Sequence, residues 1–305
     1  MPFWSKREAK SPYRYNSKAA LSRERQRAMS VGAILLQSNN DFHNSLESGE
    51  AASLKERKQS LVDWWGVSSP AEAIDTLDWL KNEGHRKHFD IVLKTYQHDL
   101  SLEDFMRMRE EASISLFDDN ISKAHPEAAD LVKKHIGILS SIIYASSDEE
   151  ADSLIEKHKS LFGDDEMLNL CFSIFVPMTY KFHDYAKHRN NLQQTLPKLL
   201  SRGFVTSEAE LKRIDVTVWD MGRMVNVARW CYDSGYITES MAWEYIFAAY
   251  KESARCYADW AAFGKAYTVG RVIWIGDNER QDAMMDIVRD LLEHEQSPWR
   301  QILLK

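Results

Sequence analysis

The chain has 305 residues, of which 44% are hydrophobic and 28% are charged, a balance typical of a globular protein that buries a sizeable core. Its 12 glycines and 7 prolines leave little room for the turns of an all-β fold and favour helices. The net charge of −7 argues against a nucleic-acid-binding protein, which usually presents a basic face.

The N-terminal residues differ from the rest of the chain in charge. Residues 1–27 carry eight Lys or Arg against two Glu, a balance of +6, which leaves −13 for the remaining residues. We expect residues 1–20 to form a basic, partly disordered arm, and residues 21–305 to form the folded domain. Such an arm on an acidic body can contact an anionic partner.

From residue 21 onward the apolar residues recur every three to four positions, which predicts helices throughout. Ser69-Pro70 begins one of them, with serine as N-cap and proline at the first helical position. Glycine at 203 and at 235, each followed by two apolar residues and a threonine, predicts tight corners between helices. The predicted helices cover residues 21–37, 54–65, 71–82, 101–117, 126–145, 148–161, 165–187, 189–201, 207–233, 239–257, 260–275 and 279–294.

The fold class is therefore all-α. We expect a single compact domain of about ten to twelve helices, which can divide into two lobes. The polar stretch at residues 146–150 is the one plausible lobe boundary, although it is too short to act as a flexible linker. No segment alternates with period two for long enough to demand a sheet.

An unusual polar cluster is predicted on the helix that contains WDMGR. Asp220 and Arg223 lie three residues apart, so the carboxylate and the guanidinium can meet on one face of the helix. Trp219 flanks Arg223 on the adjacent stripe. Arg229 points to a different side and is not expected in this cluster. Charged groups in apolar helix faces are costly unless they are paired.

The helix over residues 260–275 carries the second part of this cluster. Arg271 lies among aromatic residues that include Tyr267 and Trp274, and Gly270 beside it permits a neighbouring helix to approach closely. An arginine can stack on rings and bond a carboxylate through two donors at once. Asp220 is the natural candidate to reach Arg271.

Two interpretations of this cluster remain open at the level of sequence. Asp220, Arg223 and Arg271 can form a structural network that fixes helix packing, or they can line a pocket for an anionic or peptide group. Arginine cannot act as a base at ordinary pH, so in an enzyme Asp220 would carry the proton and the arginines would hold the substrate.

Histidines provide only weak metal-site candidates. The adjacent pair His183-Asp184 is typical of some metal-dependent hydrolases, but His183 and His188 do not share a helix face as an i, i+4 metal pair does. His85 and His88 are predicted to cap the C-terminus of a helix, where imidazolium is favoured. No phosphate-binding loop or paired-cysteine motif is present, so we expect no metal and no cofactor.

Location is predicted from what the sequence lacks. The three widely spaced cysteines form no disulfide framework, and the N-terminus has no apolar segment typical of a secretory signal. No apolar run approaches the roughly 20 residues of a membrane span. We therefore expect a cytoplasmic protein that does not contact a membrane.

Three sequence blocks carry a resemblance to a known family. They are WDMGRMVNVARWCYDSGYI with the later GRVIW, WWGVSSPAEAIDTLDWLKNEGHR at 64–86, and QRAMSVGAILLQSNNDFHNSL at 26–46. Together they resemble the bacterial domain of unknown function 1266 family, which includes the YbeU/YbeR-like proteins, over about residues 21–275. The resemblance implies that Asp220, Arg223 and Arg271 occupy positions typical of the family, but it implies no activity.

Three functional hypotheses follow. The first is an accessory protein that binds another protein through a polar cleft around the cluster. The second is an effector- or toxin-like enzyme that uses Asp220 with arginine clamps on an anionic substrate. The third is an immunity-type protein whose acidic body covers a basic toxin surface. An open pocket centred on Arg271 would favour the second, and a sealed network the first or third.

Overall fold

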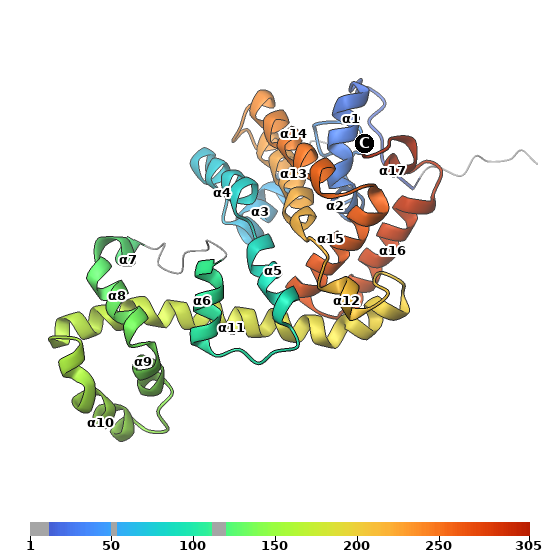
Figure 1. The fold of residues 1–305 in the computed structure, drawn as a ribbon. Coiled ribbons are helices and arrows are strands. Elements are labelled where there is room, and N and C mark those ends of the chain that lie inside the picture. Colours follow the sequence, from blue (N-terminus) through green and yellow to red (C-terminus); the bar gives the residue numbers. More distant parts are fainter. Residues whose placement is uncertain (1–11, 50–53, 112–119) are drawn as a thin grey trace, which may run out of the picture. The chain divides into compact units, whose positions relative to one another are not determined.

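A computed structural model describes residues 12–49, 54–111 and 120–305 (Figure 1). Helices form nearly all of the regular structure, and β pairing within these ranges is limited to one isolated bridge between Arg14 and Phe42. The predicted all-α class is confirmed. Within the same ranges, no helix combines the length and apolar character needed to cross a lipid bilayer.

The chain divides into two compact units. Unit 1 comprises residues 1–90 and 194–305, and unit 2 comprises residues 91–193. The lobe boundary predicted at residues 146–150 is wrong, because this stretch lies inside unit 2. There the Ser147 hydroxyl accepts a hydrogen bond from the Glu150 N–H. The polar residues form an N-cap and not a linker.

Unit 1 is built around one central helix, α13 (Thr217–Asp233), whose residues are buried from Thr217 to Cys231. A helix buried on every side belongs at the centre of a core, and α13 packs against α14, α4, α15, α3 and α2. The other helices of this unit are α1 (Arg23–Met29), α2 (Ala33–Ser38), α3 (Leu54–Trp65), α4 (Pro70–Asn82), α12 (Glu208–Leu211), α14 (Glu239–Cys256), α15 (Trp260–Ile275), α16 (Glu279–Glu293) and α17 (Pro298–Gln301).

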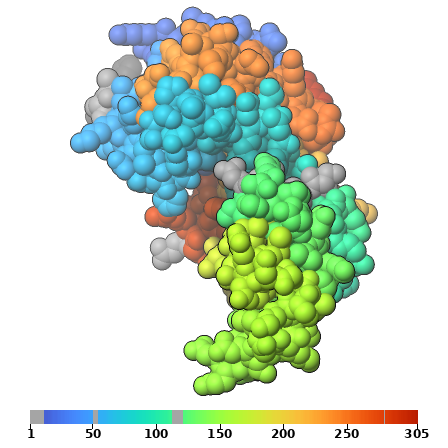
Figure 2. All heavy atoms as spheres, turned by 90° about the vertical axis from the view of Figure 1, so that its left-hand side faces the viewer, coloured from blue at the N-terminus to red at the C-terminus, as the bar shows by residue number. Residues whose placement is uncertain are grey.

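The boundaries of these helices follow local sequence signals. The Ser69 hydroxyl accepts a hydrogen bond from the Glu72 N–H at the start of α4, as the serine-proline signal predicts. Gly203 and Gly235 adopt positive φ values of 74° and 73° at the two predicted corners, a conformation that glycine tolerates best. Figure 2 shows α4 (pale blue) beside α14 (orange) on one face of unit 1, in agreement with their packing.

Unit 2 contains α6 (Leu102–Glu111), α7 (Asn120–Ala124), α8 (Pro126–Lys134), α9 (Ile136–Ile143) and α10 (Asp148–His158). Two helices, α5 (Arg86–Thr95) and α11 (Asp165–Ser201), have residues in both units. In the core of unit 2, the rings of Phe105 and Tyr185 lie 4.9 Å apart.

Several predicted helices differ from those observed. The predicted helix over 126–145 breaks at His135, whereas the two helices predicted over 165–201 form the single α11. The predicted helix over 207–233 divides into α12 and α13, and α5 was not predicted. The predicted end of α6 at residue 117 lies outside the described residues.

The predicted N-terminal arm falls only partly within the described residues, which begin at 12. Tyr13 is buried and donates a hydrogen bond to Asp290. The Tyr15 hydroxyl donates to the Gln296 carbonyl over 2.8 Å. These contacts pack residues 13–15 onto the rest of unit 1, so this part of the predicted, partly disordered arm is ordered.

Candidate functional site

A cavity of about 860 Å³ lies in unit 1, within the size range of small-molecule sites. We call it the tryptophan pocket, because six of the chain's ten tryptophans line it. Its walls come from α2, α3, α4, α13, α15 and α16. The lining residues are Leu35, Ser38, Asn39, Ser60, Trp64, Trp65, Asp75, Thr76, Trp79, His85, Trp219, Arg223, Asn226, Trp230, Tyr267, Arg271, Trp274, Ile275, Asn278, Arg280 and Met284.

Asp220 lies outside this lining and is fully buried. Its carboxylate accepts hydrogen bonds from the backbone N–H groups of His85 at 3.0 Å and Arg86 at 2.9 Å. The side chains of Arg86 and Arg223 donate at 3.2 Å and 2.6 Å. Asp220 thus caps the first turn of α5 from another helix and compensates two guanidinium groups.

Gly84 makes room for this carboxylate. Its φ is 61°, and a Cβ at this position would lie 2.1 Å from Oδ2 of Asp220. A side chain there would therefore overlap the carboxylate and also strain the backbone. The glycine explains how α4 can end and α5 begin directly against α13.

Arg223 links the buried network to the pocket wall. Besides its bond to Asp220, its Nη2 donates to Nδ1 of His85 over 2.8 Å, and its Nε donates to the Trp219 carbonyl over 3.1 Å. Its guanidinium lies over the rings of Trp219 and Trp65, 4.5 Å and 5.3 Å from their centroids. Burial lowers the pKa of Arg223, and the Asp220 carboxylate opposes that shift.

Arg271 has no such compensation. Within the described ranges, no hydrogen bond or ion pair reaches its side chain, and its Nε is buried without a partner. Burial lowers the pKa of Arg271, with neighbouring Tyr267 opposing the shift and Arg280 adding to it. The prediction that Asp220 pairs with Arg271 is wrong, because the backbone of residues 85–86 and two other arginines already occupy the carboxylate.

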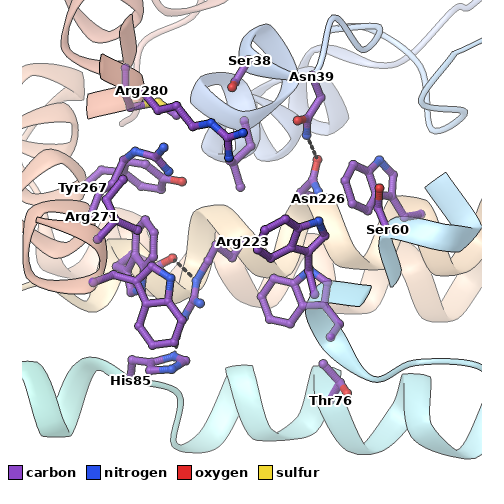
Figure 3. A pocket seen from close by; sticks show the side chains of 18 of the residues that line it. Ser38, Asn39, Ser60, Thr76, His85, Arg223, Asn226, Tyr267, Arg271 and Arg280 are labelled. Atoms are coloured by element: carbon purple, nitrogen blue, oxygen red, sulfur yellow. Dashed lines mark hydrogen bonds between the residues drawn. The ribbon is translucent and has the colours of Figure 1, made fainter. Parts of the chain in front are cut away.

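Two further donors on residues that line the pocket are also buried and lack a partner in the described part of the chain: the Tyr267 hydroxyl and the Trp219 indole N–H. Tyr267 is 1% exposed and Trp219 is 3% exposed. Burial raises the pKa of Tyr267 to about 12, although Arg271 and Arg223 lower it, so its hydroxyl keeps its proton at neutral pH. In Figure 3 the Tyr267 oxygen points toward the pocket.

Close packing of α13 against α15 brings the Trp219 and Tyr267 side chains together. A Cβ at Gly270 would lie 2.7 Å from the Cβ of Trp219, and one at Gly222 would lie 2.9 Å from the ring of Tyr267. The predicted role of Gly270 in helix approach is confirmed by this geometry. The Trp219 and Tyr267 rings then meet with their centroids 5.2 Å apart.

Trp274 and His85 form a second part of the wall. Trp274 is 39% exposed, and its ring meets the His85 ring edge-on with centroids 4.6 Å apart. The ring of Trp79, on α4, also lies edge-on to the His85 ring, with centroids 4.9 Å apart. The prediction that His85 and His88 cap a helix C-terminus is wrong: α5 begins at Arg86, so both histidines lie at the start of a helix.

Sequence patterns missed other lining residues, notably Trp65, Trp79, Asn226 and Arg280. They lie on four different helices, and periodicity along one helix does not show which helices face one another. The signal that could have found some of them is the concentration of tryptophan at 64, 65 and 79 on helices with polar neighbours.

Arg229 belongs to a separate buried cluster, as predicted. It is fully buried, and its Nη2 donates to the carbonyls of Phe42, Ser45 and Glu47 at 2.7–2.9 Å. It therefore ties the loop over residues 42–47 to α13.

The metal alternative gains no support from geometry. His183 lies on α11 with its Nε2 3.1 Å from the Tyr144 hydroxyl. Neither His183-Asp184 nor any other part of the described chain provides a group of three or more His, Cys, Asp or Glu that could hold a metal ion.

Comparison with known proteins gives one match. The family described as "Protein of unknown function (DUF1266)" matches residues 60–303. The match leaves out the resembling block at residues 26–46. It extends past residue 275, where the resemblance was expected to end. No curated protein and no solved structure matches the chain. Because the match covers more than half of the sequence, including Asp220 and most of the tryptophan pocket, this chain belongs to the DUF1266 family of proteins of unknown function.

Proposed function

We propose that this protein binds a small anionic ligand in the tryptophan pocket, with Arg271 as its main charge contact. The observation that carries the proposal is the group of donors on Arg271, Tyr267 and Trp219, which are buried at the pocket wall and have no partner within the described residues. Leaving a buried donor unsatisfied costs about 1–3 kcal/mol, and more for a charged group. Such groups in a cavity are typical of a binding site.

The chemistry of these groups favours an anion. The Trp219 indole and the Arg271 guanidinium can only donate, and Tyr267 keeps its proton. Arg280, which is exposed, adds a second cation that has no ion pair with the described residues, whereas the lining contains a single carboxylate, the exposed Asp75. A ligand rich in acceptors and negative charge satisfies this wall, and a guanidinium can hold a carboxylate or phosphate through two hydrogen bonds.

Binding is better supported than catalysis by the described groups. The enzyme hypothesis gave Asp220 the role of proton carrier, but this carboxylate is fully buried and accepts four hydrogen bonds. An open pocket around Arg271 was expected to favour the enzyme hypothesis, and it supports the part of that hypothesis in which the arginines hold an anion. A protein partner, an immunity-type role, a bacterial source and a cytoplasmic location stay predictions.

Calorimetric titration tests the proposal. Wild type and Arg271→Gln are titrated with inorganic phosphate, succinate, ribose 5-phosphate, phenyl phosphate and the four 5′-mononucleotides AMP, GMP, CMP and UMP. At least one anion should bind the wild type, and Arg271→Gln should weaken it by about tenfold or more, as expected for loss of a charged hydrogen bond worth about 1.5–3 kcal/mol.

Arg255→Gln is the matched control, because this arginine side chain is 68% exposed on α14 and pairs with Glu252 away from the pocket. It should bind the same anion as tightly as the wild type. Absence of binding by every anion, or equal binding by wild type and Arg271→Gln, would refute the proposed function.

A further inference from the structure

Three tryptophans that line the pocket, Trp65, Trp79 and Trp230, each contact a different neighbouring group. The Trp230 indole N–H donates to Asp41 over 3.2 Å, and Trp79 meets His85 edge-on. Trp65 contacts the guanidinium of Arg223. In the described ranges, no aromatic ring stacks face to face on Trp65, Trp79 or Trp230. These three indoles thus give the pocket ring surfaces on which no ring of the described residues stacks.

Asn226 adds a polar group to the same wall. It is 3% exposed, and its Oδ1 accepts a hydrogen bond from Nδ2 of Asn39 over 3.2 Å. This bond leaves the Nδ2 donors of Asn226 and the Oδ1 acceptor of Asn39 without a hydrogen bond to the described residues. A donor beside an acceptor is the pattern that recognises the edge of a nitrogen heterocycle.

The charged and amide groups lie on different sides of the pocket. Figure 3 shows Tyr267, Arg271 and Arg280 on one side and Asn39 and Asn226 on the other. A ligand that satisfies both sides carries an anionic group at one end and a hydrogen-bonding edge at the other. The tryptophans that line the same cavity favour a ligand with a flat middle, because every aromatic ring has a face that can stack on indole.

We infer that the ligand is a planar aromatic anion with a polar edge, the chemistry of a mononucleotide. This inference rests on the proposed function and names its ligand class. The anionic group lies at Arg271 and Tyr267, the ring packs on the indoles, and the edge of the ring faces Asn226 and Asn39.

A rival ligand for an aromatic pocket is a quaternary ammonium group, which aromatic cages recognise by cation–π attraction. Arg271 and Arg280 argue against it here, because both cations line the same cavity and would repel a cationic ligand. A simple aliphatic anion would satisfy Arg271 but would leave the indole surfaces and the amides unused.

The test compares ligands that share a phosphate group but differ in whether they carry an aromatic ring and a polar ring edge. Calorimetry measures binding of AMP, GMP, CMP, UMP, phenyl phosphate and ribose 5-phosphate to wild type, Trp79→Leu and Asn226→Ala. The best nucleotide should bind at least about tenfold tighter than ribose 5-phosphate, which lacks the ring. Asn226→Ala should weaken that nucleotide at least about fivefold while changing phenyl phosphate, which has no polar edge, less than about twofold. Trp79→Leu should weaken both.

Each outcome has a distinct meaning. This inference would be overturned if ribose 5-phosphate binds as tightly as the best nucleotide. The proposed function would remain intact if Arg271→Gln weakens that binding. Equal weakening of phenyl phosphate and nucleotide by Asn226→Ala would also overturn it. If no probe binds, the proposed function fails as well. Circular dichroism of each variant shows whether it is folded, and Arg280→Gln, at an exposed position, provides a second variant on the anionic side.

Discussion

Arg223 and Arg271 lie on the neighbouring helices α13 and α15, and both line the same pocket, yet their surroundings differ. Arg223 donates to a carboxylate, a carbonyl and a histidine and lies over two indole rings. Arg271 has neither a hydrogen bond nor an ion pair with the described residues. The sequence places both in similar aromatic surroundings, so residue type and burial alone do not predict which arginine is compensated.

On the proposed function, this difference separates a structural arginine, Arg223, from a ligand-binding one, Arg271. Burial of a charge is costly, and a partner inside the protein offsets that cost in the case of Arg223. Nothing in the described residues does so for Arg271, so the proposed function implies that the protein keeps this charge at the expense of stability. The predictions below compare these two regions, beginning with the network around Asp220.

Asp220→Ala should have the largest effect. Removing this carboxylate leaves Arg223 and Arg86 without their shared acceptor and also leaves two N–H groups at the start of α5 unsatisfied. The free energy of unfolding should fall by about 3–5 kcal/mol, as for other broken buried ion pairs. Urea denaturation followed by circular dichroism measures it.

A double-mutant cycle sharpens this prediction. Asp220→Ala combined with Arg223→Met should cost less than the sum of the single changes by about 1–3 kcal/mol, because the pair is in direct contact. Asp220→Ala combined with Arg271→Gln should be additive within about 0.5 kcal/mol. Strong coupling to Arg271 instead would restore the pairing that the sequence led us to expect.

Gly84→Ala should be the next most harmful change. The positive φ costs about 1–2 kcal/mol for a residue with a side chain, and overlap with the Asp220 carboxylate adds to that cost. We expect a total loss of about 2–4 kcal/mol in urea denaturation. Gly66→Ala is the matched control, because its φ is 64° and nothing lies within 4 Å of a Cβ there. Equal losses in both variants would show that Asp220 does not need the space at Gly84.

His43 should make the fold sensitive to acid. Burial, aided by Arg229, lowers the pKa of this histidine to about 3 from an ordinary value of 6.5. Below pH 6.5 the unfolded chain gains a proton that the folded chain excludes until about pH 3, so stability falls as the pH falls. His43→Gln should reduce the loss of unfolding free energy between pH 7 and pH 5 by about 2 kcal/mol. An unchanged loss over this range would show that His43 protonates in the folded state.

The sequence predicts most of the helices but not all of their boundaries. Capping serine before Pro70 and glycine corners at 203 and 235 are local signals, and the structure confirms them. The single long α11 was predicted as two helices because the polar residues near 188 resemble a break, whereas the predicted helix over 165–187 already ran through Pro177. Packing along the whole length of a helix can outweigh such local signals.

The candidate site could be predicted only in part. Spacing along α13 correctly brings Asp220 to Arg223, because both lie on one helix. The pocket depends on which helices face one another, and on the chain reversal at Gly84 that brings two backbone N–H groups to Asp220. These are tertiary contacts between residues more than 130 positions apart, and the pattern of a single sequence contains no information about them.

The most direct test of the contrast between Arg223 and Arg271 is the free energy of unfolding of Arg271→Gln, measured by urea denaturation in buffer free of polyvalent anions. If Arg271 is an uncompensated charge kept for a ligand, its removal should leave stability unchanged within about 0.5 kcal/mol or raise it slightly. A loss of about 3 kcal/mol or more, similar to that expected for Asp220→Ala, would show that Arg271 is a structural residue and would contradict the account.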